Sequence, residues 1–326
     1  NLGLRYEVFS TIKEHNNQEG TFDFSSLSLI VPKGQKAQLT PTIAASIPLR
    51  ATASRGLIDP DRNNFAPRIG FAYKVSEKLV ARGGYGIFYG GQENGPFSNP
   101  SPGFNPPFFS LENFPTNCGA PSANPGSPGN PQVDCSAPRL NVLGNGFPSD
   151  ALTDPNVPIL YSLDPRLRTP YNQQWHLGFQ YQLPSDSVLE ISYAGSRGLK
   201  LFGFYNGNQA VPTSDLSAAT APRRPAKRAI DPSIPCDLAN PDNCDPVFDT
   251  SIATFRSNIK SNYHSLQVRW EKRITHGLQF QASYTYSHAL DDASSASLGS
   301  QNQGDFRDQT NPNLEYGNAD FDVRHR

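Results

Sequence analysis

The sequence predicts an all-β chain, an antiparallel up-and-down sheet that forms a segment of a transmembrane β-barrel. Three observations predict it. Apolar and polar residues alternate with a period of two over runs of roughly 9–11 residues or more, the length that a transmembrane strand needs. Short turns alternate with long loops, so all short turns fall at one end of the sheet. Aromatic residues lie near the ends of the runs, as expected at membrane interfaces.

The clearest hairpin spans residues 263–290. From Leu278 to Ser287 every second residue is apolar, and the residues between them are glutamine, serine or threonine. The preceding run, residues 263–274, alternates in the same way. Only three residues separate the two runs, which predicts a tight turn.

The same pattern predicts the remaining strands. They are expected near residues 1–9, 68–75, 78–90, 172–183, 187–204, 263–274, 277–290 and 319–326. Long loops are expected at 10–67, 91–171, 205–262 and 291–318. The 26 glycines and 30 prolines of the chain agree with many turns and long irregular connections. Glycines 83, 84 and 86 fall inside a predicted strand, where they permit bending or close approach of the backbone.

Composition bounds the remaining possibilities. The net charge of -1 gives no sign of nucleic-acid binding. No apolar run approaches the roughly 18 residues of a transmembrane helix, although alternating barrel strands also look polar on average. The chain contains no methionine, and it begins and ends within strand-like runs. We therefore expect it to be an internal part, residues 1–326, of a longer barrel domain.

A soluble β-sandwich is the main structural alternative, because its strands alternate in the same way. The one-sided distribution of loops, the length of the strands and the aromatic residues at their ends favour the barrel.

In a barrel the polar face of each strand lines the lumen. The expected lumen-lining residues are Gln174, His176, Gln180, Gln182, Arg269, Glu271, Gln279 and Gln281. Such an amide-rich wall suits the hydroxyl and carbonyl groups of carbohydrate or peptide, and it suits ordinary hydration equally well.

Aromatic residues of the apolar face are expected in two girdles at the membrane interfaces. Those toward the short turns are Tyr73, Tyr181 and Trp270, and those toward the long loops are Tyr89, Trp175, Tyr284 and Tyr286.

The four cysteines form two local pairs within loops, Cys118 with Cys135 and Cys236 with Cys244. No CxxC spacing or nearby histidine suggests zinc. Loop disulfides in an oxidising compartment are the favoured interpretation. Four unpaired thiols are the alternative, because sequence alone cannot prove pairing.

No catalytic constellation, cofactor site or metal site is expected. Residues 59–63 begin like a calcium loop, but Asn64 and Gly70 replace the required glycine and glutamate, so a simple turn is favoured. A basic run (Arg223, Arg224, Lys227 and Arg228) could contact lipopolysaccharide phosphates, although a solvated loop is the simpler interpretation.

Four blocks of the sequence resemble the β-barrel of Oar-like TonB-dependent outer-membrane receptors of the Acidobacteria type. They are FAPRIGFAYKVSEKLVARGGYGIFYG, RTPYNQQWHLGFQYQLPSDSVLEISYAGSRG, NYHSLQVRWEKRITHGLQFQASYTYSHALDD and ADFDVRHR, which begin at residues 65, 168, 262 and 319. The long loops match that family only in position and character.

The resemblance implies a roughly 22-stranded barrel of which this chain supplies about eight strands. It also implies a plug and a carboxypeptidase-regulatory-like domain, neither within this sequence, and energy supplied by the TonB complex through that missing part. Expected partners are outer-membrane lipid, lipopolysaccharide and an unknown large nutrient such as an oligosaccharide or peptide, with no nucleic acid. The alternatives are a structural or adhesive outer-membrane barrel without transport, and a secreted β-sandwich binding module.

Overall fold

A computed structural model gives the fold of the chain. It describes residues 1–11, 13–36, 39, 44, 47–52, 56–90, 105–109, 160–245, 248, 251–275, 277–294 and 307–326. Within this described part, no helix has the length and apolar character that a membrane span requires.

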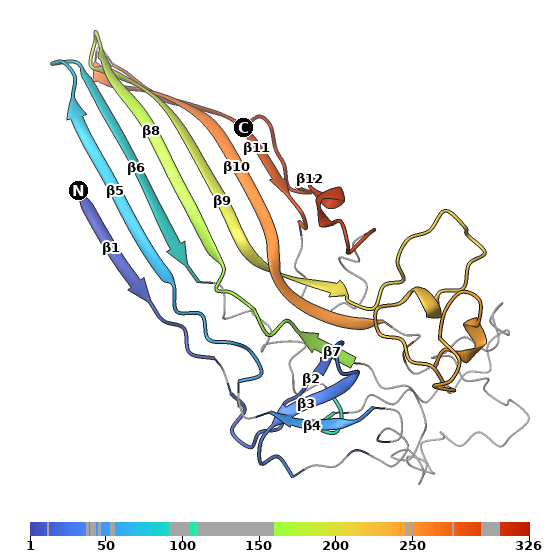
Figure 1. Ribbon diagram of the computed structural model, residues 1–326. Coiled ribbons are helices and arrows are strands. Elements are labelled where there is room, and N and C mark those ends of the chain that lie inside the picture. Colours follow the sequence, from blue (N-terminus) through green and yellow to red (C-terminus); the bar gives the residue numbers. More distant parts are fainter. Residues whose placement is uncertain are drawn as a thin grey trace, which may run out of the picture.

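A nine-stranded sheet dominates the structure (Figure 1). Across it lie β1 (Leu2–Glu7), β5 (Asn64–Lys74), β6 (Leu79–Tyr89), β8 (Tyr171–Leu183), β9 (Ser187–Asn206), β10 (Ile252–Thr275), β11 (Leu278–Asp291) and β12 (Gly317–Asn318), in this order. These neighbours pair antiparallel, and β7 (Leu160–Leu163) adds a short parallel pairing to β10. The antiparallel meander predicted from the sequence is confirmed, and the sheet is open in the described part of the chain.

The register of the sheet separates two faces. One continuous row across six strands holds Tyr73, Ala81, Phe179, Ile191, Val268 and Tyr284. Because side chains alternate along each strand, this row and every second row beyond it form an apolar face. The rows between them form a polar face. Among the residues that the structure describes, no second sheet covers the apolar face, and Ile69, Phe179 and Trp270 are about half exposed at 52%, 46% and 44%. A sandwich would bury this face.

The three short turns are staggered relative to these rows. Tyr73 lies four residues from the centre of its turn at Glu77, and Phe179 lies six residues from Ser185. Val268 lies eight residues from the centre of the turn between Thr275 and Gly277. Two residues of stagger for every two strands, at roughly 3.3 Å per residue and 4.8 Å per strand, correspond to a strand tilt of about 35°. Membrane barrels tilt their strands by roughly 35–45°.

Counting residues from the turns also gives the height of the apolar face. This face begins two residues from a turn at Leu79 and continues to Trp175 and Tyr286, ten residues from theirs. With the tilt above, this span rises by roughly 22 Å, close to the roughly 25 Å apolar band of outer-membrane barrels. Two residues further on, the same face carries His264 and His288, which lie directly opposite each other.

Glycines let aromatic rings lie flat on the sheet. A Cβ atom on Gly195 would lie 2.5 Å from Nε1 of Trp175 on the neighbouring strand. A Cβ atom on Gly84 would lie 2.9 Å from the ring of His176 on the polar face. These strand glycines therefore permit close approach of neighbouring side chains, whereas bending or close approach of the backbone was the role predicted for glycines 83, 84 and 86.

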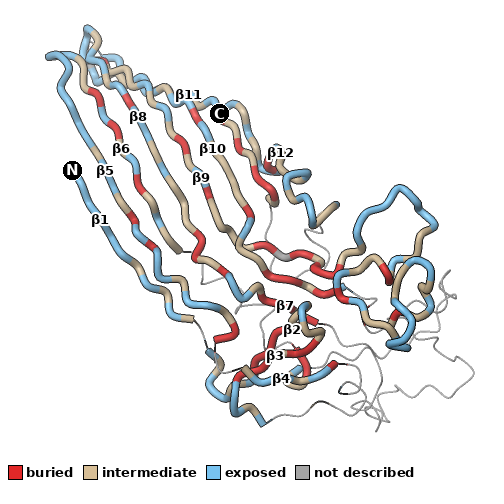
Figure 2. The backbone as a smooth tube through the Cα atoms, viewed as in Figure 1, coloured by how far each residue is buried: buried red, intermediate tan, exposed pale blue. Residues whose placement is uncertain are grey.

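Described parts of three long loops fold together at the other end of the sheet. A second sheet joins β2 (Thr21–Asp23), β3 (Ser28–Pro32) and β4 (Leu49–Thr52). We call β2–β4, β7, residues 207–248 and residues 251–256 of β10 the loop unit. Its core packs buried side chains from distant parts of the chain: Phe22, Leu29, Ile47, Leu160, Ala226, Phe248 and Ile252. Figure 2 shows buried residues concentrated in this region, whereas the strands toward the short turns are largely exposed or intermediate.

Several predicted boundaries were wrong in the loops. The predicted loop 10–67 contains β2–β4 and the start of β5, and loop 91–171 contains β7 and the first residue of β8. Loop 205–262 contains the first half of β10, and loop 291–318 contains β12 and a short 3₁₀ turn, Pro312–Glu315. These segments lack clean alternation because both of their faces are buried or because pairing is very short.

The predicted strand 319–326 is also largely absent. Residues 319–322 form a turn, and only the end of the segment pairs with β11, through a bridge between His325 and Tyr286. Backbone hydrogen bonds of 2.9 and 3.0 Å join Arg326 and Thr285. Asp322 accounts for the turn, because its carboxylate accepts a hydrogen bond from the backbone N–H of Ala289 at 2.8 Å and so holds the chain folded back.

Candidate functional site

The polar face carries all eight residues that the sequence predicts as lumen-lining. Gln180, Glu190 and Arg269 occupy one row, and Glu271 lies opposite Gln281. The guanidinium of Arg269 donates to the Glu271 carboxylate at 2.8 Å and to the Gln281 side-chain carbonyl at 3.4 Å. Both ends of the ion pair are about half exposed, so it fixes side-chain orientation more than it adds stability.

A shallow cavity of about 480 Å³ lies on this wall near the loop end. Gly84 and Gly86 line it, and the rings of His176 and Phe88 lie close to these two glycines. The Arg68 guanidinium stacks on the Phe88 ring at 4.5 Å, a cation–π contact. The remaining polar wall residues are Gln174, His176, Ser196 and Tyr263. Aromatic faces beside hydrogen-bonding groups can hold a polar organic ligand such as a sugar.

A second cavity, of about 660 Å³, opens within the loop unit. It is lined by β2 and β3, by residues 57–59 and 162–166, and by Thr254 and Arg256 of β10. Its walls therefore combine three loops that are distant in the sequence. Ser162 connects two of them, because its hydroxyl donates to the backbone carbonyl of Phe22 at 2.7 Å.

The charged groups of this loop-unit cavity divide into two kinds. Asp23 is structural: burial raises its pKa, but hydrogen bonds from Ser26 and Ser25 outweigh burial and hold that pKa below its usual value. Asp164 accepts a hydrogen bond from the backbone N–H of Arg166 at 2.9 Å. Within the described part of the chain, the carboxylate of Asp59 and the guanidinium of Arg256 have no hydrogen-bond or ion-pair partner. Arg256 lies over the Tyr205 ring at 5.6 Å.

Asp59 can therefore bind a positively charged group of a ligand, and Arg256 can bind a negatively charged group of the same ligand. Sequence reasoning did not single out Arg256, Arg68, Phe88 or Tyr263 as site residues. Arg68, Phe88 and Tyr263 are ordinary members of alternating strands, and Arg256 fell in the predicted loop 205–262. Asp59 was noticed only as part of an incomplete calcium-loop pattern. Its neighbour Asp61 is used structurally, accepting a hydrogen bond from the backbone N–H of Thr169 at 2.8 Å.

The predicted girdle residues lie at graded distances from the short turns. Tyr73 and Tyr181 lie four residues from theirs and Trp270 six. Tyr284 lies eight residues away, and the most distant are Trp175 and Tyr286 at ten and Tyr89 at twelve. The order agrees with the two predicted groups, and their role as membrane girdles stays a prediction.

The cysteines and the basic run lie in or near the loop unit. A disulfide joins Cys236 and Cys244, eight residues apart, whereas Cys118 and Cys135 lie outside the described residues. The cations of the basic run are occupied within their own loop. Arg223, Arg224 and Lys227 donate to backbone carbonyls, and Arg228 pairs with Asp245. These contacts stabilise the loop fold, and contact of the basic run with lipopolysaccharide stays a prediction.

Comparison with known proteins identifies the family to which the chain is matched. A model described as "Outer membrane beta barrel domain" matches residues 1–326. Among solved structures, the outer membrane transporter YddB from Escherichia coli is similar, with 13% identity and a TM-score of 0.36 over 73% of this chain and 21% of that chain. The FrpB iron transporter from Neisseria meningitidis (F3-3 variant) is similar over 70% of this chain and 20% of its own, with 11% identity and a TM-score of 0.29.

The chain thus spans about a fifth of the length of these two solved structures. No match was found among curated proteins. The family model covers the wall and the loop unit alike, so both cavities described above lie within the matched region.

Proposed function

This chain belongs to the outer membrane beta barrel domain family, and from that premise we propose that it forms part of the wall and mouth of an outer-membrane nutrient transporter. The protein resides in the outer membrane. The proposed orientation follows from the two faces of the sheet. The apolar face contacts lipid, and the polar face lines the lumen, because exposed amide and charged side chains are costly in hydrocarbon.

The observation that carries the proposal is the loop-unit cavity with its two unpaired charges. It lies at the long-loop end of the sheet, which is the extracellular end in outer-membrane barrels. There Asp59 and Arg256 meet a ligand before it reaches the polar wall. The cavity on that wall, with Arg68 stacked on Phe88, offers a second contact on the way through the barrel.

An oligosaccharide or a peptide is the proposed cargo. Both present many hydroxyl, amide or carbonyl groups, which the glutamine-rich wall and the mixed charges of the loop-unit cavity can bind. Transport of such a large molecule requires energy at the outer membrane. Following the resemblance of the strand blocks to TonB-dependent receptors, we propose that the TonB complex supplies it through parts of the protein outside this sequence.

Uptake by cells producing the full-length protein tests this function. Fluorescently labelled maltoheptaose and a labelled hexapeptide serve as probes, with and without a protonophore. For at least one probe we expect uptake that the protonophore abolishes. The double variant Asp59→Asn and Arg256→Gln should reduce that uptake by about tenfold or more, because each charge-assisted contact contributes roughly that much affinity.

Lys74→Gln, at an exposed site beside a short turn, is the matched control and should leave uptake unchanged. Surface binding of both probes without protonophore-sensitive uptake would contradict transport and favour a barrel that only displays its loops. Equal uptake by the double variant and the parent would exclude the loop-unit cavity as the entry site.

A further inference from the structure

The apolar face changes character at one level near its loop end. Along most of the sheet this face carries aliphatic and aromatic residues. Twelve residues from the short turns, β8 to β11 carry Gln173, Arg197, His264 and His288 instead, whereas β6 carries Tyr89. If this face contacts lipid, as proposed above, the change marks the level where hydrocarbon gives way to the headgroups of the outer leaflet.

Six residues on three neighbouring strands, eight to fifteen residues from the short turns, form a surface around this level, which we call the wall patch. They are Tyr171, Trp175, Tyr193, Arg197, Lys200 and His264. The indole of Trp175 lies flat over Gly195, and its ring centre is 5.9 Å from that of His264. Lys200 Nζ lies 5.5 Å from the centre of the Tyr171 ring. The wall patch thus joins flat aromatic surfaces to cations.

Three hydrogen-bond donors of the wall patch have no partner among the described residues. In the described part of the chain, the Arg197 guanidinium, the Lys200 ammonium and the Trp175 indole N–H make no hydrogen bond or ion pair. The Tyr193 hydroxyl lies 2.6 Å from Nδ1 of His264. When this hydroxyl donates to Nδ1, the neutral imidazole carries its proton on Nε2, so His264 can donate outward without being charged.

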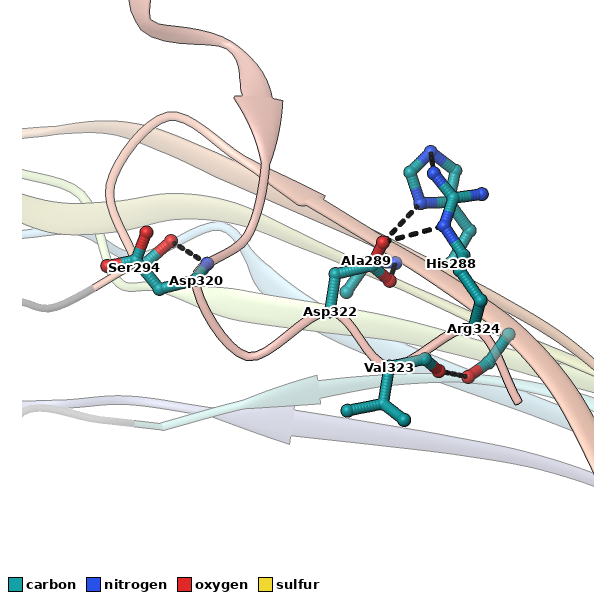
Figure 3. Close-up of polar contacts among 8 residues, drawn as sticks. His288, Ala289, Ser294, Asp320, Asp322, Val323 and Arg324 are labelled. Atoms are coloured by element: carbon teal, nitrogen blue, oxygen red, sulfur yellow. Dashed lines mark hydrogen bonds and ion pairs between the residues drawn. The ribbon is translucent and has the colours of Figure 1, made fainter. Parts of the chain in front are cut away.

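The carboxylate of Asp322 does not neutralise the cations of the wall patch. Asp322 lies beyond β11, where it contacts Nδ1 of His288 at 3.2 Å and the Arg324 guanidinium at 2.8 Å (Figure 3). Its negative charge is therefore balanced by Arg324. None of the positions on this face of β8, β9 and the described part of β10 carries a carboxylate between the Trp175 row and the loop unit. The wall patch is a site of net positive charge.

We propose that the wall patch binds the phosphorylated disaccharide headgroup of an outer-leaflet glycolipid of the lipid A type. Arg197 and Lys200 would contact a phosphate, since guanidinium and ammonium groups form charge-assisted hydrogen bonds with phosphate oxygens. Trp175 would pack against a sugar ring or an acyl chain near the headgroup, with His264 donating to a sugar or phosphate oxygen. A glycolipid uses the aromatic surface and the cations together, whereas a phospholipid headgroup needs only the cations.

Native mass spectrometry of the full-length protein in detergent tests the proposal. The probes are bisphosphorylated lipid A, monophosphorylated lipid A and phosphatidylglycerol. The double variant Arg197→Ala and Lys200→Ala should weaken binding of bisphosphorylated lipid A by about tenfold or more. The parent should bind monophosphorylated lipid A more weakly than the bisphosphorylated form, and phosphatidylglycerol at equal concentration should not displace either.

The matched control removes two cations at the other end of the sheet, by Lys74→Ala and Lys272→Ala, and should leave lipid A binding unchanged. Heat-modifiable migration of every variant confirms folding, and Arg197→Gln alone provides a milder change of the wall patch. Binding of lipid A by the double variant within twofold of the parent would overturn the proposal. Displacement of lipid A by equimolar phosphatidylglycerol would overturn it too, because it would show attraction to any anionic headgroup.

Discussion

The tilted sheet and the loop unit are stabilised in different ways. In the sheet, the long strands pair in the order in which they occur along the chain, and the described residues leave the apolar face uncovered. In the loop unit, Phe22, Leu160 and Phe248 meet in one buried core although they lie far apart in the sequence. The sheet therefore depends on backbone hydrogen bonds and on lipid, whereas the loop unit resembles a small water-soluble domain.

This difference predicts that mutations will act locally and by different rules in the two regions. A loss of apolar volume should damage the loop unit, because its core is closely packed. An added charge should damage the sheet, but only on its apolar face.

Truncation of Phe248 should give the largest effect. Its side chain is 1% exposed and contacts Phe22 and Arg228, so Phe248→Ala should destabilise the loop unit by about 3–5 kcal/mol. Limited proteolysis should then cleave within residues 205–262, while heat-modifiable migration shows an intact barrel. Leu216→Ala, at a side chain that is 98% exposed, is the control and should not change cleavage. Loss of the barrel in Phe248→Ala would show that the two regions fold as one.

A cation placed on either face of β8 tests which face of the sheet contacts lipid. Phe179→Arg adds a cation to the middle of the apolar face and should reduce the free energy of unfolding by about 2–4 kcal/mol. Gln180→Arg adds the same cation one residue further on, facing the polar side, and should have little effect. Urea titration of the full-length protein in lipid, followed by heat-modifiable migration, measures both. Equal destabilisation would contradict the assignment of the apolar face to lipid.

Gly195→Ala should have a moderate effect confined to the wall patch. The new methyl group would lie 2.5 Å from the Trp175 indole and must displace it, at a cost of about 1–3 kcal/mol. In a Trp270→Phe background, the fluorescence of Trp175 should shift, since its ring leaves the sheet. Gly3→Ala, where no atom lies within 4 Å of the added carbon, should leave both stability and fluorescence unchanged. An unchanged spectrum in Gly195→Ala would contradict the stacked position of Trp175.

Acid should weaken the turn at residues 319–322, and this is the smallest of the expected effects. The hydrogen bond from the Ala289 N–H holds the pKa of Asp322 below its usual value, against the effect of burial and with help from His288 and Arg324. A lowered pKa means that the contact stabilises the turn fully above about pH 4 and is lost as pH falls through the folded-state pKa.

Hydrogen exchange at the Ala289 amide measures this release. After correction for the intrinsic exchange rate, its protection should fall by about tenfold or less between pH 6 and pH 2.5. In Asp322→Ala, protection should be low at both values. Protection that is independent of pH in the parent would show that the carboxylate does not hold the turn.

The sequence alone determined the strands of the wall, their order and the polar or apolar face of each side chain. The physical reason is that strand alternation and tight turns are local properties, readable within ten or twenty residues. Gln174, His176 and Gln180 could therefore be assigned to one face without coordinates. Tertiary structure was needed for the stagger of the turns, and thus for the level at which Arg197 and His264 lie on the wall.

Only the tertiary structure decided the loop unit and the sites that depend on it. Asp59 and Arg256 line one cavity because β2, β7 and the extended end of β10 pack together, and no local pattern records packing between segments more than a hundred residues apart. The same holds for the basic run at Arg223–Arg228, whose charges looked free in the sequence and are used by the fold to bind its own carbonyls and Asp245. Local alternation therefore determines the strands of the wall, whereas burial of residues that are distant in the sequence determines the loop unit.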